Sequence, residues 1–196
     1  MAEFGVVAAR RGLGMQELLA IISDADDARL PFLARELLVL QVEHLRVIEA
    51  RLAELDGRLL RQARDDEAAR RLTEIPGIGP VIATAMVATV VDARLFGSGR
   101  SFAAWLGLTP RQHATGGRER LLGISKRGDG YLRRQLMHGA RFLVRVAAGR
   151  EHQPWAWING LCGRRPFNVV VAAVANKLAR MIWAMLSRGE TYRAPA

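Results

Sequence analysis

The chain has 196 residues, of which 50% are apolar and 24% are charged, enough to fill one ordinary hydrophobic core or two small ones. This composition excludes a disordered tail and a small disulfide-bonded domain. A net charge of +10 and a pI near 11.3 indicate an anionic partner and argue against a nonspecific binder of acidic proteins.

The chemistry of the chain also indicates where it works. Cys162 is the single cysteine, so no internal disulfide can form and a reducing, cytoplasmic compartment is expected. The first residues lack the order of a signal peptide, and no uncharged apolar run reaches the roughly 18 residues that span a bilayer. We therefore expect no membrane partner.

The positive charge is concentrated in the second half of the chain. Residues 1–70 carry a net charge of −3, whereas residues 111–150 hold 10 Lys and Arg against 2 acidic residues. Nearly all the cations are arginines, whose planar guanidinium groups suit bidentate phosphate contacts. A general codon bias toward arginine would not produce this segregation.

A long helix is predicted over residues 29–64, where apolar residues recur at helical spacing. Leucines fall seven residues apart at Leu38, Leu45, Leu52 and Leu59. Glu and Arg fill most of the positions between them, so we expect a helix that packs against one partner and is otherwise exposed. The partner could be a second copy, the other arm of a hairpin or the chain's own domain.

The motif Ile75-Pro-Gly-Ile-Gly-Pro80 separates two helical segments, 65–72 and 81–91. Pro76 ends the first helix and Pro80 suits the first turn of the second, which predicts a helix-hairpin-helix. Free amides near Gly77 and Gly79, at the positive end of the second helix, could face a phosphate. A purely structural turn is the alternative.

Residues 96–100 are expected to form a loop, followed by a short helix that Ser101 caps and that ends near Gly107. Residues 109–123 have three glycines, three arginines and no helical or strand period. We therefore expect a long exposed loop there, and its polar residues favour a function.

A helix with two opposed faces is predicted over residues 131–148. One face is apolar, and the other carries Arg134, His138, Arg141 and Arg145 with no acidic residue, which favours phosphate contact over a merely solvated surface. Residues 149–166 are expected to form a loop in which Trp155 could stack on a base or pack. The last helix, 168–187, is apolar except at Asn176, Lys177 and Arg180 and is expected to be the central core helix.

Several of these motifs together resemble the carboxy-terminal transposase domain of the insertion sequence 110/1111 family of DEDD-type transposases. They are Ile75 to Pro80, Phe102 to His113, Gly116-Gly117, Gly123 to Asp129 and Tyr131 to Arg134. The resemblance covers nearly the whole chain, with the helix before Pro76 matching the family's coiled-coil linker. It also implies that this segment follows a ribonuclease-H-like domain, whose four acidic residues bind magnesium.

The resemblance implies a recombinase that acts on DNA and is guided by a structured noncoding RNA. Its hydroxyl nucleophile is a serine before a glycine in the family, and the matching residue here is Thr115. Arg111, Lys126 and Arg127 are the candidates for stabilising charge on the attacked phosphate, and His113 could assist a proton transfer. The expected nucleic-acid contacts are Gly77, Gly79, Arg118, Arg120, Arg134, Arg141 and Arg145. We expect the arginines after residue 110 and the amides of the glycine turn to converge on one concave surface shaped for a polyphosphate strand.

We thus predict an all-α fold with a helical arm over residues 1–70 and a compact helical domain with a helix-hairpin-helix over 71–196. The predicted function is that of a transposase fragment of the bacterial cytoplasm and nucleoid, inactive alone, which cleaves DNA when paired with the magnesium-binding domain. No cofactor is expected within this chain itself. The alternative is a noncatalytic nucleic-acid-binding module that regulates an intact transposase. Both versions predict a homo-oligomer or pairing with full-length transposase.

Overall fold

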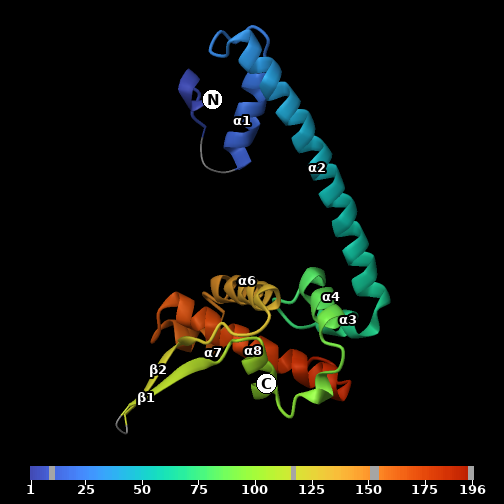
Figure 1. The fold of residues 1–196 in the computed structure, drawn as a ribbon, viewed down its shortest axis with the longest axis vertical. Coiled ribbons are helices and arrows are strands. Elements are labelled where there is room, and N and C mark those ends of the chain that lie inside the picture. The colour runs from blue at the N-terminus through green and yellow to red at the C-terminus, as the bar shows by residue number, and fades with distance from the viewer. Residues whose placement is uncertain (9–11, 116–117, 151–154, 194–196) are drawn as a thin grey trace. The chain divides into compact units, whose positions relative to one another are not determined.

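The structure is a computed structural model that describes residues 1–8, 12–115, 118–150 and 155–193, with the backbone alone at 12–13, 112–115 and 118–121 (Figure 1). The helices are η1 (Ala2–Phe4), α1 (Gly12–Ser23), α2 (Phe32–Asp65), α3 (Glu67–Leu72), α4 (Pro80–Thr89), η2 (Ala93–Leu95), α5 (Gly99–Trp105), α6 (Gly130–Val146), α7 (Trp155–Cys162) and α8 (Phe167–Arg188). Within these described ranges the one sheet pairs β1 (Pro110–Thr115) with β2 (Arg118–Ile124). The predicted all-α class is therefore confirmed.

The contacts divide the chain into two units, Met1–Gly57 and Arg58–Ala196, a division that falls before the arm boundary expected at residue 70. The first unit has a small core around Val6, Ile21 and Leu30. Arg35 of α2 fastens this core, because its guanidinium donates to the carbonyl oxygens of Ile21 at 2.7 Å and Asp27 at 2.5 Å. These bonds satisfy carbonyls at and beyond the end of α1.

The apolar seam of α2 is unevenly covered, with Leu38, Leu45 and Leu59 half-buried. Leu38 packs on the small core of the first unit, whereas Leu52 and Leu55 are 55% and 52% exposed. Side chains of this size and exposure on one long helix are typical of a helix that has a further partner.

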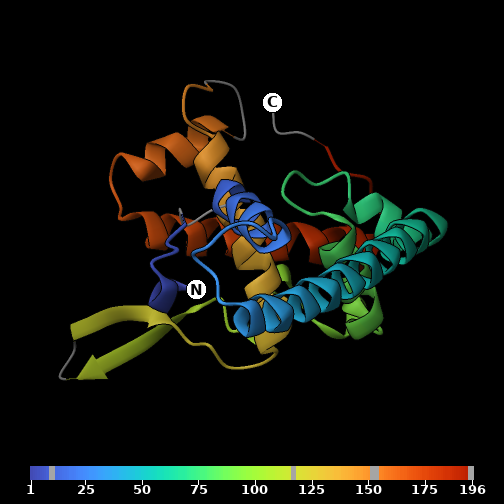
Figure 2. The same cartoon turned by 90° about the horizontal axis from the view of Figure 1, so that it is seen from above.

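The second unit is built around α8. Eight of its side chains are buried: Val170, Val171, Val174, Ala175, Leu178, Ala179, Ile182 and Met185. The buried face of α6, which includes Leu132, Leu136 and Leu143, belongs to the same core (Figure 2). Burial of this inner face explains the apolar character of α8, and the prediction of a central core helix is correct.

Only α8, among the helices of the described residues, is long and apolar enough to cross a membrane. Its buried face is part of the core of the second unit, a position that also accounts for its composition. Its polar residues lie on the opposite side.

The prediction of a loop over residues 109–123 is wrong, because β1 and β2 form an antiparallel hairpin there. Pro110 pairs with Ile124 and Thr115 with Arg118, with an irregularity in the register near Pro110. Alternation of apolar and polar residues marks a strand only where one of its faces is buried. Leu122 and Arg111 are exposed, so the part of this ribbon whose side chains are described lacks that signal.

Two helix predictions also need correction. The expected loop over 149–166 contains α7, which forms because Trp155 and Ile158, three residues apart, are buried in the core. Trp155 therefore packs in the core, which is one of the two roles predicted for it, rather than standing free to stack on a base. The start of α5 is Gly99, and the residue that caps it is Ser98 rather than Ser101, because the Ser98 hydroxyl accepts from the Ser101 amide at 3.1 Å.

Candidate nucleic-acid interface

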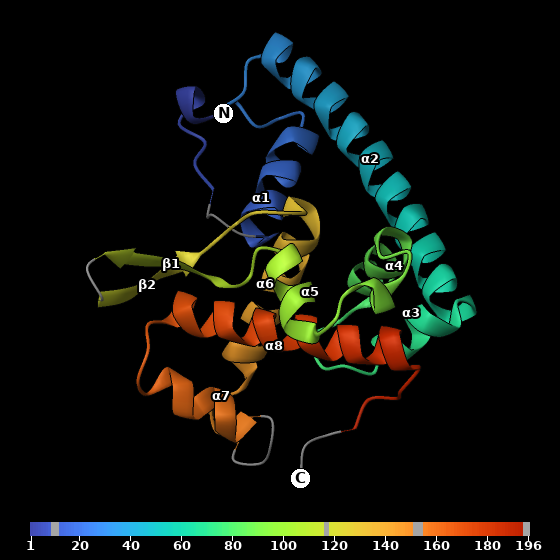
Figure 3. The same cartoon turned by 60° about the horizontal axis from the view of Figure 1, so that its bottom comes forward.

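A wide groove of about 1920 Å³ runs along the outer side of α8 and is also lined by residues of α5 and of the base of the β1–β2 hairpin. Figure 3 shows α5, α8 and the hairpin next to one another. Seven cationic side chains line it: Arg100, Arg111, Lys126, Arg165, Lys177, Arg180 and Arg188. No Asp or Glu occurs among the described residues of its lining. We call this surface the α8 groove. Arg188 pairs with Glu190, outside the lining, at 3.5 Å, and the excess of positive charge along the rest of the groove suits a polyanion.

Both walls of the α8 groove are fastened to α8 itself. The Trp183 indole nitrogen donates to the carbonyl oxygens of Ala93 at 3.0 Å and Phe96 at 3.1 Å. The Asn176 amide donates to the Leu108 carbonyl oxygen at 3.2 Å, just before β1. These bonds fix the spacing between the walls, so the cations are held in place before any ligand binds.

Lys177 is half-buried, whereas the other six cations of the α8 groove are exposed. Its Nζ lies 4.2 Å from the centre of the Trp157 ring, a cation–π contact. Burial lowers the pKa of Lys177 below its ordinary value of 10.5, and the charge of Arg180 lowers it further. An anion in the groove would relieve both effects.

A tight crossing of two backbone segments presents Lys126 to the α8 groove. The amides of Ser125 and Lys126 donate to the carbonyl oxygens of Thr109 at 2.8 Å and Gly107 at 3.1 Å. Lys126 itself has a φ of 57°, in the left-handed region that costs a non-glycine residue about 1–2 kcal/mol. The crossing therefore holds Lys126 in a conformation that it would not adopt alone.

Gly107 and Gly128 make this crossing possible. They have φ values of 70° and 85°, and a Cβ on either would overlap the backbone of the other segment, at Arg127 and Trp105 respectively. Only glycine fits at both positions. We call these two segments, 105–109 and 125–129, the glycine clasp.

Arg133 of α6 joins the two segments of the glycine clasp, and sequence analysis missed it. Its Nη1 donates to the carbonyl oxygens of Leu106 at 3.0 Å and Arg127 at 3.2 Å. The only available signal was its place beside buried Leu132, at the edge of the apolar stripe. Charged side chains at such an edge often reach a backbone carbonyl.

The structure brings some predicted catalytic residues together and separates others. Arg111 and Lys126 both line the α8 groove. Arg127 is exposed beside it and is not among its lining residues. Thr115 is four residues beyond Arg111 on β1, about 13 Å along the strand at roughly 3.3 Å per residue.

The far half of the hairpin is described by its backbone only. Thr115 pairs with Arg118 and His113 with Arg120 across the two strands. Their side chains lie outside the described part of the structure, as do Gly116 and Gly117 altogether. The predicted nucleophile is thus placed on a ribbon that leads away from the helices (Figure 3).

The cations of α6 form a separate surface. Arg134, Arg141 and Arg145 are not among the residues that line the α8 groove. They lie opposite the buried stripe of α6, which packs on α8, so they point away from α8. The expectation that all these cations converge on one concave surface is therefore wrong.

Gly77 and Gly79, the two glycines of the predicted phosphate turn, have different surroundings. Gly77 has a φ of 83°, and a Cβ there would lie 2.8 Å from Leu143 of α6, so packing alone requires a glycine. Gly79 caps α4 without a side-chain bond and has open space around it. Phosphate contact at the start of α4 stays a prediction that fits Gly79 better than Gly77.

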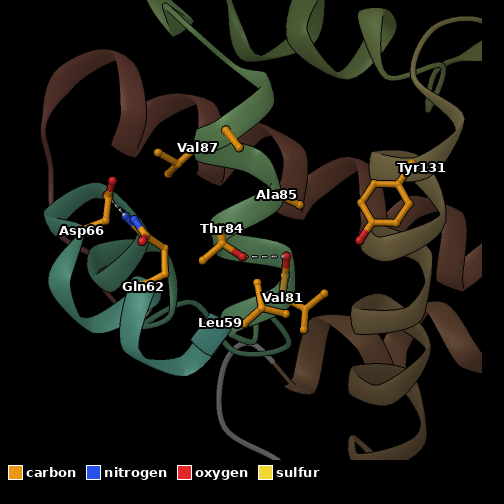
Figure 4. Close-up of a pocket in the computed structure, with 10 residues that line it drawn as sticks. Leu59, Gln62, Asp66, Val81, Thr84, Ala85, Val87 and Tyr131 are labelled. Atoms are coloured by element: carbon orange, nitrogen blue, oxygen red, sulfur yellow. Dashed lines mark hydrogen bonds between the residues drawn. The ribbon is translucent and has the colours of Figure 1, made fainter. Parts of the chain in front are cut away.

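An apolar pocket of about 480 Å³ lies between the end of α2, α4 and the start of α6. Figure 4 shows Tyr131 on one side, facing Ala85 across the pocket, with Leu59 and Val81 lining it further along. Thr84 contributes a hydroxyl that already donates to the Pro80 carbonyl oxygen at 2.8 Å. Most of the lining is apolar, but Gln62 and Asp66 also line the pocket, and the Asp66 carboxylate accepts from the Ala69 amide at 2.8 Å.

Among the residues described, no three His, Cys, Asp or Glu side chains are grouped so that they could hold a metal ion. The magnesium that the resemblance implies stays a prediction for a separate acidic domain. We assign no metal ligand to this chain.

Comparison with known proteins identifies the family. Residues 69–155 match the model of the transposase IS116/IS110/IS902 family. The chain is 48% identical to a Pseudomonas aeruginosa protein named "Probable family 20 transposase", over 98% of this chain and 57% of that protein. It is 39% identical to the transposase for insertion sequence element IS1111A of Coxiella burnetii, over 100% of this chain and 54% of that protein.

A third relative is the transposase for insertion sequence element IS1328 of Yersinia enterocolitica, 36% identical over 98% of this chain and 57% of that protein. The chain thus spans little more than half the length of these three relatives. The family match includes α4, the glycine clasp, the hairpin and α6. The chain therefore carries a transposase domain of the IS116/IS110/IS902 family.

Proposed function

We propose that this chain is the DNA-binding part of a transposase and that the α8 groove holds the backbone of duplex DNA. The observation that carries the proposal is the groove's lining of seven cations with no acid among its described residues. Arginines and lysines in such a surface neutralise phosphates and release counterions, which supplies most of the affinity for DNA.

The proposed chemistry uses the hydroxyl of Thr115. Its oxygen would attack a DNA phosphorus, a phosphothreonine ester would form, and the bond from phosphorus to a deoxyribose oxygen would break with a proton passing to that oxygen. Arg111, Lys126 and Arg127 would stabilise the charge that develops on the phosphate. Because Thr115 is about 13 Å along the strand from Arg111, this requires DNA or a second protein segment to bring the hairpin and the cations to one phosphate.

The same distance favours a second candidate function, a noncatalytic nucleic-acid-binding module. In that version the α8 groove binds DNA, and the hairpin contributes affinity instead of a nucleophile. A structured noncoding RNA is a proposed partner in either version.

Binding is tested by the salt dependence of affinity for a labelled DNA duplex. Replacing Arg100, Arg165 and Arg180 with Gln should flatten the slope of log K against log salt by about 2.7, at roughly 0.9 per phosphate contact. Arg70→Gln is the matched control, since Arg70 is exposed and outside the groove. An unchanged slope in the triple variant would rule out the α8 groove as the duplex site.

The chemistry is tested by a covalent adduct. The chain is incubated with terminal DNA, magnesium and a full-length relative that supplies the remaining domain, and adducts that survive denaturation are measured. Thr115→Ala should abolish the adduct on this chain, and Thr115→Ser should keep it. An adduct that persists in Thr115→Ala refutes the nucleophile, and no adduct with any variant supports the noncatalytic module.

We also propose that α2 pairs with a second copy or with full-length transposase. The exposed Leu52 and Leu55 of its heptad seam support this proposal. Leu45→Asp combined with Leu52→Asp should reduce the mass in sedimentation to that of one chain. If the double variant and the parent chain sediment with the same mass, the pairing is refuted.

A further inference from the structure

The outer face of α6 combines two kinds of side chain that bind nucleic acid in different ways. Three arginines, Arg134, Arg141 and Arg145, lie along it with His138, and the aromatic rings on it are Tyr131 and Phe142. We propose that this α6 face is a second nucleic-acid surface, which binds unpaired nucleotides, while the α8 groove binds duplex. The inference rests on the proposed function for the duplex site only.

The cations of the α6 face are not neutralised within the described structure. α6 contains no Asp or Glu, and none of its arginines forms an ion pair with another described residue. The Nε of Arg141 is buried without a hydrogen-bond partner among the described atoms. Protein atoms cover this Nε, so a phosphate on the α6 face would meet the exposed guanidinium groups of Arg134 and Arg145 and supply the missing negative charge there.

The aromatic side chains give the α6 face its preference for unpaired bases. Tyr131 is 48% exposed and Phe142 is 59% exposed, although α6 buries its other apolar side chains well. The two residues are eleven positions apart, which is close to three helical turns and about 16 Å along the same side. Exposed rings beside backbone cations are how proteins bind single strands, because bases stack on the rings and phosphates meet the cations.

The apolar pocket at the start of α6 extends this surface. Tyr131 forms one wall, and Val81 and Ala85 of α4 line it as well (Figure 4). Its volume of about 480 Å³ falls within the usual range of small-molecule sites, roughly 300–1,000 Å³. An unstacked base could move from water into this pocket and stack on the Tyr131 ring.

The two surfaces can be occupied at the same time. The α6 face lies opposite the stripe that α6 buries in the core, and the α8 groove lies on the outer side of α8, whose inner face is buried in that same core. A ligand on one surface therefore does not cover the other. This arrangement suits a protein that holds a duplex and a single-stranded segment together.

The test uses two fluorescent probes of equal length, a single-stranded oligonucleotide without self-complementarity and the corresponding duplex. The single strand is supplied both as DNA and as RNA, which separates these two sources of unpaired nucleotides. Tyr131→Ala and Phe142→Ala should each weaken single-strand binding about fivefold or more, since stacking on one ring contributes roughly 1 kcal/mol or more. Binding of the duplex should change by less than twofold.

Matched variants make the result specific. Tyr131→Phe keeps the ring and should bind the single strand like the parent chain. Phe167→Ala removes an aromatic side chain that is 44% exposed on α8 and should leave single-strand binding unchanged. Arg134→Gln with Arg145→Gln should flatten the salt slope for the single strand by about 1.4, at roughly 0.7 per contact.

Three outcomes overturn the inference: unchanged single-strand binding in the two alanine variants, an equal loss for single strand and duplex, or a loss in Phe167→Ala as large as theirs. The triple variant of the α8 groove tests the proposed function separately. If that variant keeps duplex binding while the α6 variants lose the single strand, the proposed duplex site fails and the α6 face stands.

Discussion

The glycine clasp can be tested directly by adding one methyl group. Gly128→Ala places a Cβ that would overlap the carbonyl oxygen of Trp105 and lie 2.9 Å from its carbonyl carbon. Because the obstructing atoms belong to the backbone, no change of side-chain rotamer relieves the overlap. The two segments of the clasp must then move apart.

Two contributions set the size of the effect. The φ of 85° at Gly128 costs alanine about 1–2 kcal/mol, and separation of the segments should cost at least as much again. We expect a loss of about 3 kcal/mol or more in the free energy of unfolding. That is a large fraction of the stability of an ordinary domain, roughly 5–15 kcal/mol.

Gly149→Ala is the matched control. Gly149 has a φ of 76°, and no atom of the described residues lies within 4 Å of its would-be Cβ, so the substitution carries the conformational cost without the overlap. Urea unfolding followed by circular dichroism gives both values, and the shift should be clearly larger for Gly128→Ala. Equal losses would show that the close approach of Gly128 to Trp105 does not exist, and with it the account of how Lys126 is held would fail.

Three further predictions concern the surroundings of the groove. Asp129→Ala should lower the free energy of unfolding by about 1 kcal/mol, because the Asp129 carboxylate caps α6 by accepting from the Leu132 amide at 2.8 Å. Asp129→Asn should keep most of that stability, and equal losses in the two variants would refute the cap. Arg133→Gln should weaken duplex binding about as much as Lys126→Gln does, and the double variant should bind the duplex as well as either single variant. If the two losses add, Arg133 does not act through Lys126. The pKa of Lys177 is lowered in the folded chain, so the unfolded chain keeps this proton to a higher pH, and the free energy of unfolding should rise as the pH approaches 10.5. Lys177→Met should reduce that rise. If the variant and the parent chain show the same pH profile, the charge of Lys177 is not buried.

The sequence allowed the main helices to be predicted because each long helix carries an apolar face. α6 and α8 bury that face in the core, whereas α2 shows the same periodicity with Ala63 as its one buried residue in the described structure, and α4 is marked by Pro80 at its first turn. α7 and the hairpin lack such a signal. α7 is only eight residues long, and the side chains described at the base of the hairpin, on both strands, are largely exposed.

The candidate site could be predicted only where its residues are close in sequence. Arg111 and Lys126 were predicted because they are close in sequence to the loop in which the family resemblance places the nucleophile. Arg100, Arg165 and Arg188 join the same groove from α5 and from the two ends of α8, which no local pattern reveals. The polar exceptions within apolar α8, Lys177 and Arg180, were visible in the sequence, and the structure shows that they mark its groove side.

The position of Thr115 on β1 makes the proposed reaction depend on a further component. A nucleophile set among the groove cations could attack any duplex that bound there, whereas one carried about 13 Å along β1 from Arg111 meets an activated phosphate only after another component completes the site. The glycine clasp fixes the base of the hairpin to α5 and α6 through the bonds of Arg133, so the ribbon is anchored where the DNA would lie. Binding and reaction would then be separate events, and cleavage would depend on assembly of the complete complex.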